Sequence, residues 1–298
     1  MERIGELFAF GTAVCWSIGA VFFEQGVKRI GVISVNFFKV VFASVLLTVT
    51  AGLMRGMPMP VDAPVRALIF LSLSGIVGFV VSDMFLFTAY ATVGPRVAML
   101  FMALSPPITA AMAYLFLGES LGSKGWLGMG FVFTGICMTV IGRQGGFSFS
   151  KINKADRWGY ISASFIPVCN SAGMVLSKAG LGDYHPVSAT QIRAFTAVIG
   201  FGLISLFYTK GKNLAKAVKD AEGMKYTAIG SIFGPFLGVT MLLFALQRVN
   251  TGIVSTLTGL TPVLIMLPEI LVFKKKLKPV EIAGAFIAVA GTAIFFLW

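Results

Sequence analysis

The stretch TVGPRVAMLFMALSPPI at residues 92–108 recurs in altered form as RVNTGIVSTLTGLTPVL at residues 248–264. The two stretches align without a gap at an offset of 156, and the alignment extends over residues 88–142 and 244–298, where 8 of 55 positions are identical. It matches residues that constrain the backbone, since Pro106 falls on Pro262 and Gly135 on Gly291. This pattern predicts two copies of one structural unit.

The composition indicates the environment of these copies. Hydrophobic residues make up 57% of the 298 residues and charged residues 12%, whereas soluble domains carry roughly 25% charge. Apolar runs of about 20 residues, each long enough to cross a hydrocarbon core of roughly 30 Å, follow one another along the chain. This excludes a soluble enzyme fold, a disordered chain and a nucleic-acid-binding protein. We predict an all-α integral membrane protein with ten transmembrane helices, at 6–25, 33–53, 65–90, 96–117, 122–142, 158–178, 187–208, 225–246, 252–273 and 279–298.

The duplication reaches the start of the chain at an offset of 154, where Lys39 falls on Arg193. We therefore expect a first five-helix repeat at 1–143, a linker at 144–157 and a second five-helix repeat at 158–298. At the same offset four further pairs are identical: Cys15 with Cys169, Ser17 with Ser171, Gly19 with Gly173 and Gly26 with Gly180.

An odd number of helices in each repeat places the second copy in the membrane upside down relative to the first. Inverted repeats are typical of secondary transporters, because two similar halves of opposite orientation can expose a central site to one side and then to the other. We therefore predict transport by alternating access. The alternative is that duplication only built a larger helix bundle.

The basic residues concentrate in the connectors and predict the orientation. Six Lys and Arg lie on the side that holds both termini and 16 on the other side, with Lys39 and Arg193 inside spans. Because cytoplasmic loops carry the excess of Lys and Arg, this count places both termini outside the cytoplasm. The predicted location is the plasma (inner) membrane. The net charge of +12 is thus a topology signal.

Ionisable residues inside spans are expensive to insert and usually face a wet cavity or a partner. Asp83 lies inside the third span, and Ser82, Asp83 and Tyr90 belong to a polar stripe at helical spacing on that span. We predict that this face lines the transport path, with Asp83 as a proton carrier or a ligand for a substrate amine. The alternative is a structural ion pair between Asp83 and Lys39 or Arg193.

Two further pairs occupy matched positions in the two repeats. Lys39 and Arg193 are candidates for gating or for attracting a carboxylate, and the alternatives are snorkelling to the headgroups and internal pairing. Trp16 and Asn170 lie well inside the membrane and need hydrogen-bond partners, which either a polar substrate or a neighbouring helix can supply. Five prolines inside spans are candidates for helix kinks: Pro106, Pro107, Pro167, Pro235 and Pro262.

Three stretches resemble the drug/metabolite transporter superfamily in its EamA-type ten-helix branch. They are AVCWSIGAVFFEQG at 13–26 with its echo PVCNSAGMVLSKAG at 167–180, LSPPITAAMAYLFLGESLGSKGWLGMGFVFTG at 104–135, and LTPVLIMLPEILVFKKKLKPVEIAGAFIAVAG at 260–291. The resemblance implies export or exchange of small metabolites, amino acids among them, through a cavity between the halves, with spans 5 and 10 at the periphery. The family's glutamate after span 4 is present as Glu119, whereas Lys275 stands at the matching position after span 9.

We predict a secondary active transporter that exports or exchanges small metabolites such as amino acids, coupled to protons through Asp83. One alternative is an exchanger of phosphorylated metabolites, indicated by the run of Lys274, Lys275, Lys276 and Lys278. Another is a membrane accessory subunit that transports nothing.

Enzyme activity is not expected, because no His–Ser or Asp–Asp pair lies at matched depth. Neither a cofactor nor a metal is predicted, since there is no GxxxxGK[ST] phosphate loop and His185 is the single histidine. The expected partners are membrane lipid, a small-molecule substrate and protons, with no nucleic acid, and the chain is expected to be a monomer or a homodimer.

Overall fold

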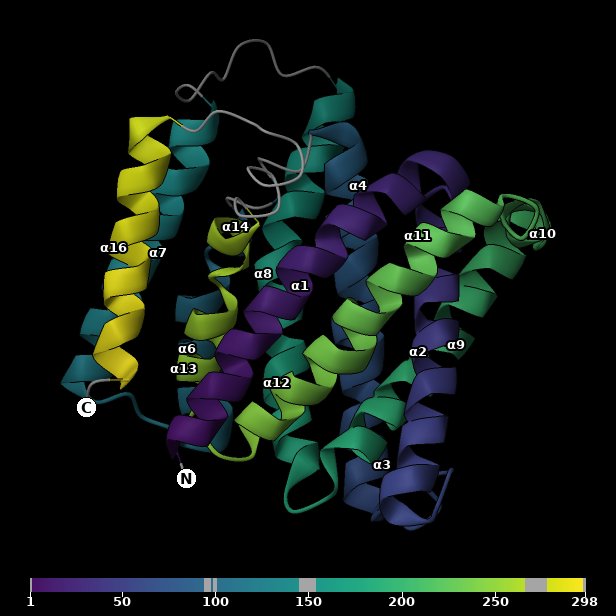
Figure 1. Cartoon of the computed structure of the whole chain (residues 1–298), viewed down its shortest axis with the longest axis horizontal. Helices are drawn as coiled ribbons and strands as arrows, with labels where there is room; N and C mark the ends of the chain where they lie inside the picture. Colours follow the sequence, from purple (N-terminus) through teal and green to yellow (C-terminus); the bar gives the residue numbers. More distant parts are fainter. Residues whose placement is uncertain (1, 94–97, 99–100, 145–153, 266–277, 297–298) are drawn as a thin grey trace.

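The computed structural model describes residues 2–93, 98, 101–144, 154–265 and 278–296 (Figure 1). Within these ranges the regular secondary structure is helical, with no strand. The predicted all-α class is confirmed for these residues. Lys274, Lys275 and Lys276 lie outside the described residues, and so does the side chain of Tyr90.

The helices follow in two series separated by residues 145–153. The first series is α1 (Glu2–Ile30), α2 (Val32–Arg55), α3 (Val65–Gly75), the π-helix η1 (Ile76–Val81), α4 (Ser82–Thr92), α6 (Ser105–Leu117) and α7 (Ser123–Gln144). The second is α8 (Lys154–Leu181), α9 (Pro186–Thr209), α10 (Lys212–Ala217), α11 (Ala221–Ser231), the π-helix η2 (Ile232–Gly238), α12 (Val239–Leu246), α13 (Thr251–Thr258), α14 (Thr261–Leu264) and α16 (Pro279–Phe296).

Six stretches of helix among the described residues are long and apolar enough to cross a membrane. Shorter apolar helices accompany them at Ser105–Leu117, Thr251–Leu264 and Pro279–Gly291. These lengths fit a multi-pass membrane protein, and the count of ten spans stays a prediction. The six long stretches are Arg3–Ile30, Val32–Arg55, Val65–Ala89, Arg157–Leu181, Pro186–Thr209 and Ala221–Leu246.

Large apolar side chains on the outer helix faces fit the same environment. Phe116 on α6, Phe207 on α9 and Phe286 on α16 are 74%, 80% and 72% exposed. Soluble proteins seldom expose apolar surface on this scale, whereas hydrocarbon is as apolar as these side chains. The outer faces are therefore suited to contact lipid.

The helix bounds repeat with the offsets found in the sequence. α2 and α9 both have 24 residues, and their first residues, Val32 and Pro186, lie 154 apart. From the third helix onward the offset is 156, since α3 begins at Val65 and α11 at Ala221, and since η1 and η2 begin at 76 and 232. The two extra residues of the second half therefore lie between its second and third long helices.

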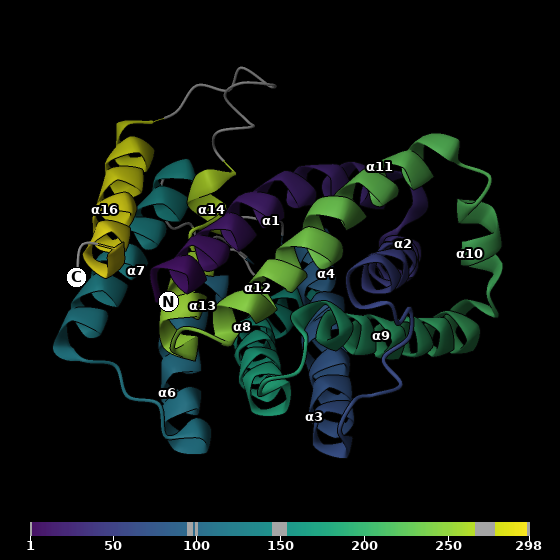
Figure 2. The same cartoon turned by 60° about the horizontal axis from the view of Figure 1, so that its bottom comes forward.

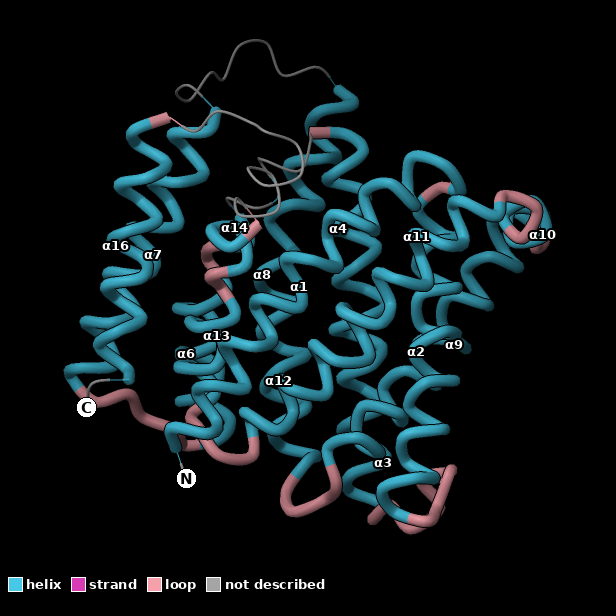
Figure 3. The backbone as a smooth tube through the Cα atoms, in the orientation of Figure 1, coloured by secondary structure: helices cyan, strands magenta, loops and turns pink. Residues whose placement is uncertain are grey.

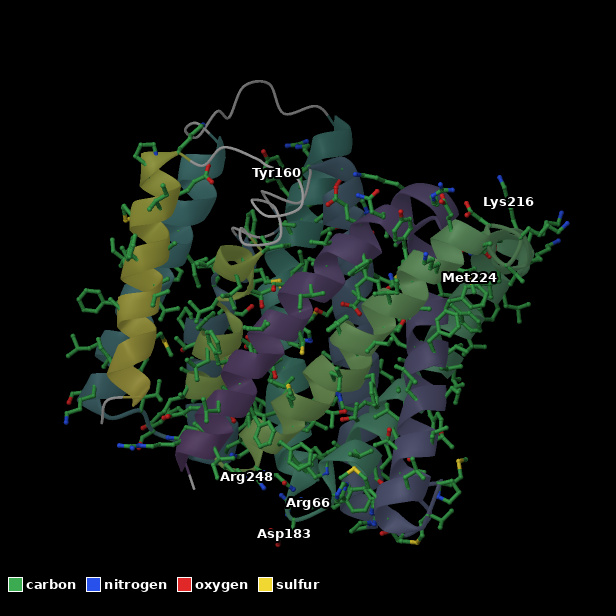
Figure 4. All side chains as sticks on the ribbon, in the orientation of Figure 1. Arg66, Tyr160, Asp183, Lys216, Met224 and Arg248 are labelled. Carbon is green, nitrogen blue, oxygen red and sulfur yellow. The ribbon has the colours of Figure 1, made fainter. Side chains whose placement is uncertain are left out.

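The two series run in opposite directions. In Figure 1, α1 begins at the lower end, near both chain termini, whereas α8 begins at the upper end. Figure 4 places Arg66, Asp183 and Arg248 at the lower end and Tyr160 and Lys216 at the upper end. These five residues lie in or near connectors, so the connectors of both series gather at the two ends of the bundle.

Two of the predicted spans contain a break. The chain makes a turn at 103–104 before α6 and another at 259–260 between α13 and α14, and Figure 3 shows the second as a loop inside the bundle. Pro106, Pro107 and Pro262 stand in the first turn of the helix that follows each break. A proline is tolerated there because the first N–H groups of a helix have no partner within it. We expected these prolines inside continuous helices, and the structure places them at helix starts.

α7 and α16 form a pair at the edge of the bundle (Figures 1 and 2). Their backbones approach closely because glycines face the contact. A Cβ at Gly135 would lie 2.4 Å from the backbone nitrogen of Ala288, and one at Gly291 would lie 2.7 Å from the backbone nitrogen of Val132. Small residues permit this approach between membrane helices. The peripheral position fits the one implied for spans 5 and 10.

Candidate functional site

A cavity of about 190 Å³ lies between the two series of helices. It is lined from both halves, by α1, α2, η1, α4 and α6 on one side and by α8, α9, η2, α12, α13 and α14 on the other. None of its described lining residues belongs to α7 or α16. Six of the seven predicted substrate or coupling residues line it: Trp16, Lys39, Ser82, Asp83, Asn170 and Arg193.

Lys39 and Asp83 form an ion pair inside the cavity. Nζ of Lys39 lies 2.5 Å from Oδ2 of Asp83, and the two side chains are 6% and 18% exposed. The rings of Phe23, Phe87 and Phe201 surround the ammonium group, with centroids 5.8, 5.2 and 5.9 Å away. Ring faces attract a cation, so α2 and α4 are tied together by a charge pair within an aromatic shell. This is the internal pairing given above as one alternative for both residues, and the coupling role of Asp83 stays a prediction.

Arg193 lies in the same cavity without such a pair. The residue is 4% exposed, and its guanidinium carbon lies 4.8 Å from the centroid of the Phe79 ring. Nε and Nη1 of Arg193 have no hydrogen-bond partner among the described residues, and neither has the buried hydroxyl of Ser105, which also lines the cavity. Buried polar groups are nearly always hydrogen-bonded, so these atoms have hydrogen-bonding capacity that the described side chains leave unused.

The two π-helices bring the backbone of both halves to the cavity. Gly78 of η1 and Gly234 of η2 both line it and lie 156 residues apart. π segments are rare and occur frequently at functional sites. Of these two segments only Pro235 was predicted from the sequence, and it stands inside η2 and also lines the cavity. The matched glycines are the sequence signal that could have indicated both segments.

Glycines also allow the helices around the cavity to approach one another. A Cβ at Gly75 would lie 2.7 Å from the carbonyl oxygen of Arg193, and one at Gly173 would lie 2.8 Å from Cα of Gly78. Trp16 is held against η2 in the same way, because a Cβ at Gly238 would lie 2.6 Å from its Nε1. The backbone of α9 that carries Arg193 therefore packs directly on the helix that leads to Asp83.

Buried hydroxyl groups join three helices beside the cavity. Thr109 on α6 donates to Ser171 on α8 at 2.8 Å and accepts from Ser255 on α13 at 3.0 Å. Ser171 in turn donates to the backbone carbonyl of Ser105 at 3.2 Å. Ser171 was noted from the repeat, whereas Thr109 and Ser255 lie 146 residues apart and no sequence spacing pairs them. The bonds connect the two halves next to Asn170.

The sequence model of the EamA-like transporter family matches residues 3–141 and 157–297. The chain belongs to the EamA-like transporter family. This confirms the resemblance to the drug/metabolite transporter superfamily, and it places this EamA-like protein among membrane transporters of small molecules rather than among enzymes.

A solved crystal structure has the same fold. It shares 18% sequence identity with this EamA-like protein over 98% of this chain and 96% of its own, with a TM-score of 0.75. At this identity the similarity concerns the fold alone. No curated protein matches the chain.

One end of this EamA-like protein is held together around Lys178, where the termini lie. Nζ of Lys178 donates to the carbonyl oxygens of Leu246 and Val249, the latter at 2.9 Å, and lies 3.4 Å from Oε1 of Glu119. Oε2 of Glu119 accepts from the backbone N–H of Thr251 at 2.6 Å, at the start of α13. Two side chains thus join the ends of α6, α8 and α12 to the start of α13. From the sequence, Glu119 stands out only through the family resemblance.

The cavity extends toward the opposite end. Glu24, near the end of α1, lines it, and its side chain is 57% exposed and lies 2.7 Å from Nζ of Lys28.

The predicted kink residue Pro167 stands inside α8. No group of three or more His, Cys, Asp or Glu side chains that could hold a metal occurs in the described part of the chain.

A second polar cluster covers the connector between α2 and α3 of this EamA-like protein. Nη2 of Arg55 lies 2.5 Å from Oδ2 of Asp62, and the hydroxyl of Tyr184 donates to Oδ1 of Asp62 at 3.1 Å. The hydrogen bond from Arg55 lowers the pKa of Asp62 below its ordinary value. Burial and the charge of Arg55 lower the pKa of His185. This cluster links the two halves away from the cavity.

Proposed function

We propose that this EamA-like protein is a secondary active transporter that exports or exchanges small metabolites, amino acids among them, by alternating access. The observation that supports the proposal is the cavity between the two halves, which is lined by matched positions of both repeats. About 190 Å³ exceeds the roughly 150 Å³ of a protein cavity known to bind benzene. The space therefore suits a molecule of amino-acid size.

The proposed topology is ten spans in two inverted five-helix repeats, at 1–143 and 158–298, with a linker at 144–157. The matched helix bounds and the opposite directions of α1 and α8 support it. Both termini would lie outside the cytoplasm of a plasma (inner) membrane, as the distribution of Lys and Arg indicates. In this arrangement the bonds around Lys178 close the end that bears the termini, and Glu24 marks the open end.

Proton coupling is part of the proposal and rests on Asp83. The other charged side chains among the described residues that line the cavity are those of Lys39, Arg193 and Glu24. Protonation of Asp83 would release the ammonium group of Lys39 and so loosen the contact between α2 and α4. Alternation between paired and released states is a means by which a proton gradient can drive the change of access.

Counterflow in proteoliposomes of the purified full chain tests the proposal. Labelled amino acids, phosphorylated sugars and inorganic phosphate are offered separately, with and without a pH gradient. We expect saturable exchange of amino acids that responds to the gradient in the native chain and loses that response in Asp83→Asn, but not in the connector variant Asp183→Asn. Exchange of phosphorylated compounds alone would favour the phosphate-ester alternative. A correctly folded chain that exchanges nothing would favour an accessory role.

A further inference from the structure

The cavity contains two buried cations that the duplication places at equivalent positions. Lys39 on α2 and Arg193 on α9 lie 154 residues apart, which is also the offset between the first residues of these helices. Both line the cavity and are 5% and 4% exposed. The two sites differ in their counter-charge, since Lys39 has the carboxylate of Asp83 at 2.5 Å and Arg193 has no ion pair among the described residues.

The second half lacks the equivalent of that carboxylate. From the third helix onward the offset between the halves is 156, so Asp83 corresponds to Val239. Val239 is 3% exposed, lines the cavity and packs in one apolar cluster with Phe201 of α9. The position that would hold a carboxylate for Arg193 therefore holds an apolar side chain.

Arg193 shows the consequence directly. Nε and Nη1 find no hydrogen-bond partner in the described structure, and Phe79 lies over the guanidinium group at 4.8 Å. A guanidinium group binds a carboxylate through charge-assisted N–H···O hydrogen bonds. A buried cation without an ion-pair partner is unfavourable. An anionic group that enters the cavity can therefore pair with Arg193 as Asp83 pairs with Lys39.

We propose that Arg193 is a carboxylate subsite and that the ligand is a monocarboxylate with an apolar body. Among the described residues that line the cavity, Lys39 and Arg193 carry two buried positive charges and Asp83 carries one negative charge, so a single further carboxylate balances them. Apolar side chains that line the cavity, among them Met174 and Leu242, suit the body of the ligand. The inference rests on the proposed transport function and narrows its substrate class.

Three compounds with the same apolar body provide the test. L-Leucine has a carboxylate and an ammonium group, 4-methylpentanoate has only the carboxylate, and 3-methylbutylamine has only the ammonium group. Binding to the purified full chain in detergent is measured by calorimetry and by the rise in the unfolding temperature. We expect at least one of the two carboxylates to bind more tightly than the amine, whichever of the two is preferred. Arg193→Gln should weaken this binding by about 10- to 100-fold, since it removes a charged hydrogen-bond donor.

A second substitution tests the argument from the repeat. Val239→Asp supplies in the second half the carboxylate that the first half has, so it should abolish carboxylate binding by occupying Arg193. Val239→Asn has the same size without the charge and should retain the binding. If Val239→Asp does not fold, Arg193→Gln still decides the question. Equal binding of carboxylates and amine to the native chain, no carboxylate binding, or unchanged binding in Arg193→Gln would each overturn the subsite.

Counterflow separates this proposal from the proposed function. Leucine exchange that proceeds equally well in Arg193→Gln overturns the carboxylate subsite and leaves transport intact. Carboxylate binding that depends on Arg193, in a folded chain that exchanges nothing, supports the subsite and overturns transport.

Discussion

The Lys39–Asp83 pair leads to a quantitative prediction about stability. The Lys39 side chain is 6% exposed, its ammonium group has three phenylalanine rings around it, and Asp83 is its ion-pair partner at 2.5 Å. Removal of one partner from a buried pair leaves an uncompensated charge and costs about 3–5 kcal/mol. We therefore expect Asp83→Asn and Lys39→Met each to lower the free energy of unfolding by about this amount.

The double variant distinguishes the pair from its parts. Lys39→Met combined with Asp83→Leu removes both charges and keeps the volume apolar, and such replacements are often neutral or stabilising. We expect the double variant to recover most of the loss, so that the coupling energy of the cycle is several kcal/mol. The cycle consists of the native chain, Asp83→Leu, Lys39→Met and their combination, and unfolding titrations in mixed micelles compare these four proteins. Asp83→Asn is measured beside them.

One result would refute this reasoning. If Asp83→Asn lowers the free energy of unfolding by less than about 1 kcal/mol, the charge of Lys39 is satisfied without Asp83, as expected for a solvated pair at a surface. Asp183→Asn in the exposed connector is the control for the chemical change and should have no measurable effect.

Three further predictions concern other parts of the molecule. Gly135→Ala should lower the free energy of unfolding by about 1–3 kcal/mol, because its Cβ would collide with α16. Gly130→Ala is the control and should have no such effect, because a Cβ there would have nothing within 4 Å. Equal effects of the two substitutions would contradict the close helix contact. Glu119→Ala removes the acceptor for the Thr251 N–H and should cost about 1 kcal/mol in the same titration. The pKa of Asp62 is lowered, so its charged form contributes stability above its ordinary pKa of about 3.9, and this contribution is lost as the pH falls. The unfolding temperature of Asp62→Asn should therefore depend less on pH below about pH 4 than that of the native chain.

Much of the fold follows from patterns that the sequence repeats. Apolar runs of membrane length predict the long helices, and the offset that sets Lys39 over Arg193 also relates the bounds of α2 and α9. The breaks before α6 and α14 were harder to predict. Proline indicates only that a helix cannot continue unchanged, and tertiary packing decides between a kink and a new start.

The candidate site divides in a similar way. Single polar residues inside apolar runs, such as Asp83 and Asn170, could be found because membrane burial of polar groups is costly. The hydroxyl contacts of Thr109 and the pairing of Lys178 with Glu119 could not, since they join helices far apart in the chain. Serine and threonine also satisfy their own helix backbone, so their presence in a span carries little information.

The matched π segments also bear on the history of the chain. A π turn holds one residue more than an α turn, so each segment corresponds to a single extra residue in a helix. Both begin at equivalent positions, 76 and 232, although few other residues remain identical between the halves. The same extra residue is most simply acquired once, in a gene that encoded one repeat, and then copied. The ancestor would then have been a half-length chain that already had this wide turn, and the difference between Asp83 and Val239 would have arisen after the duplication.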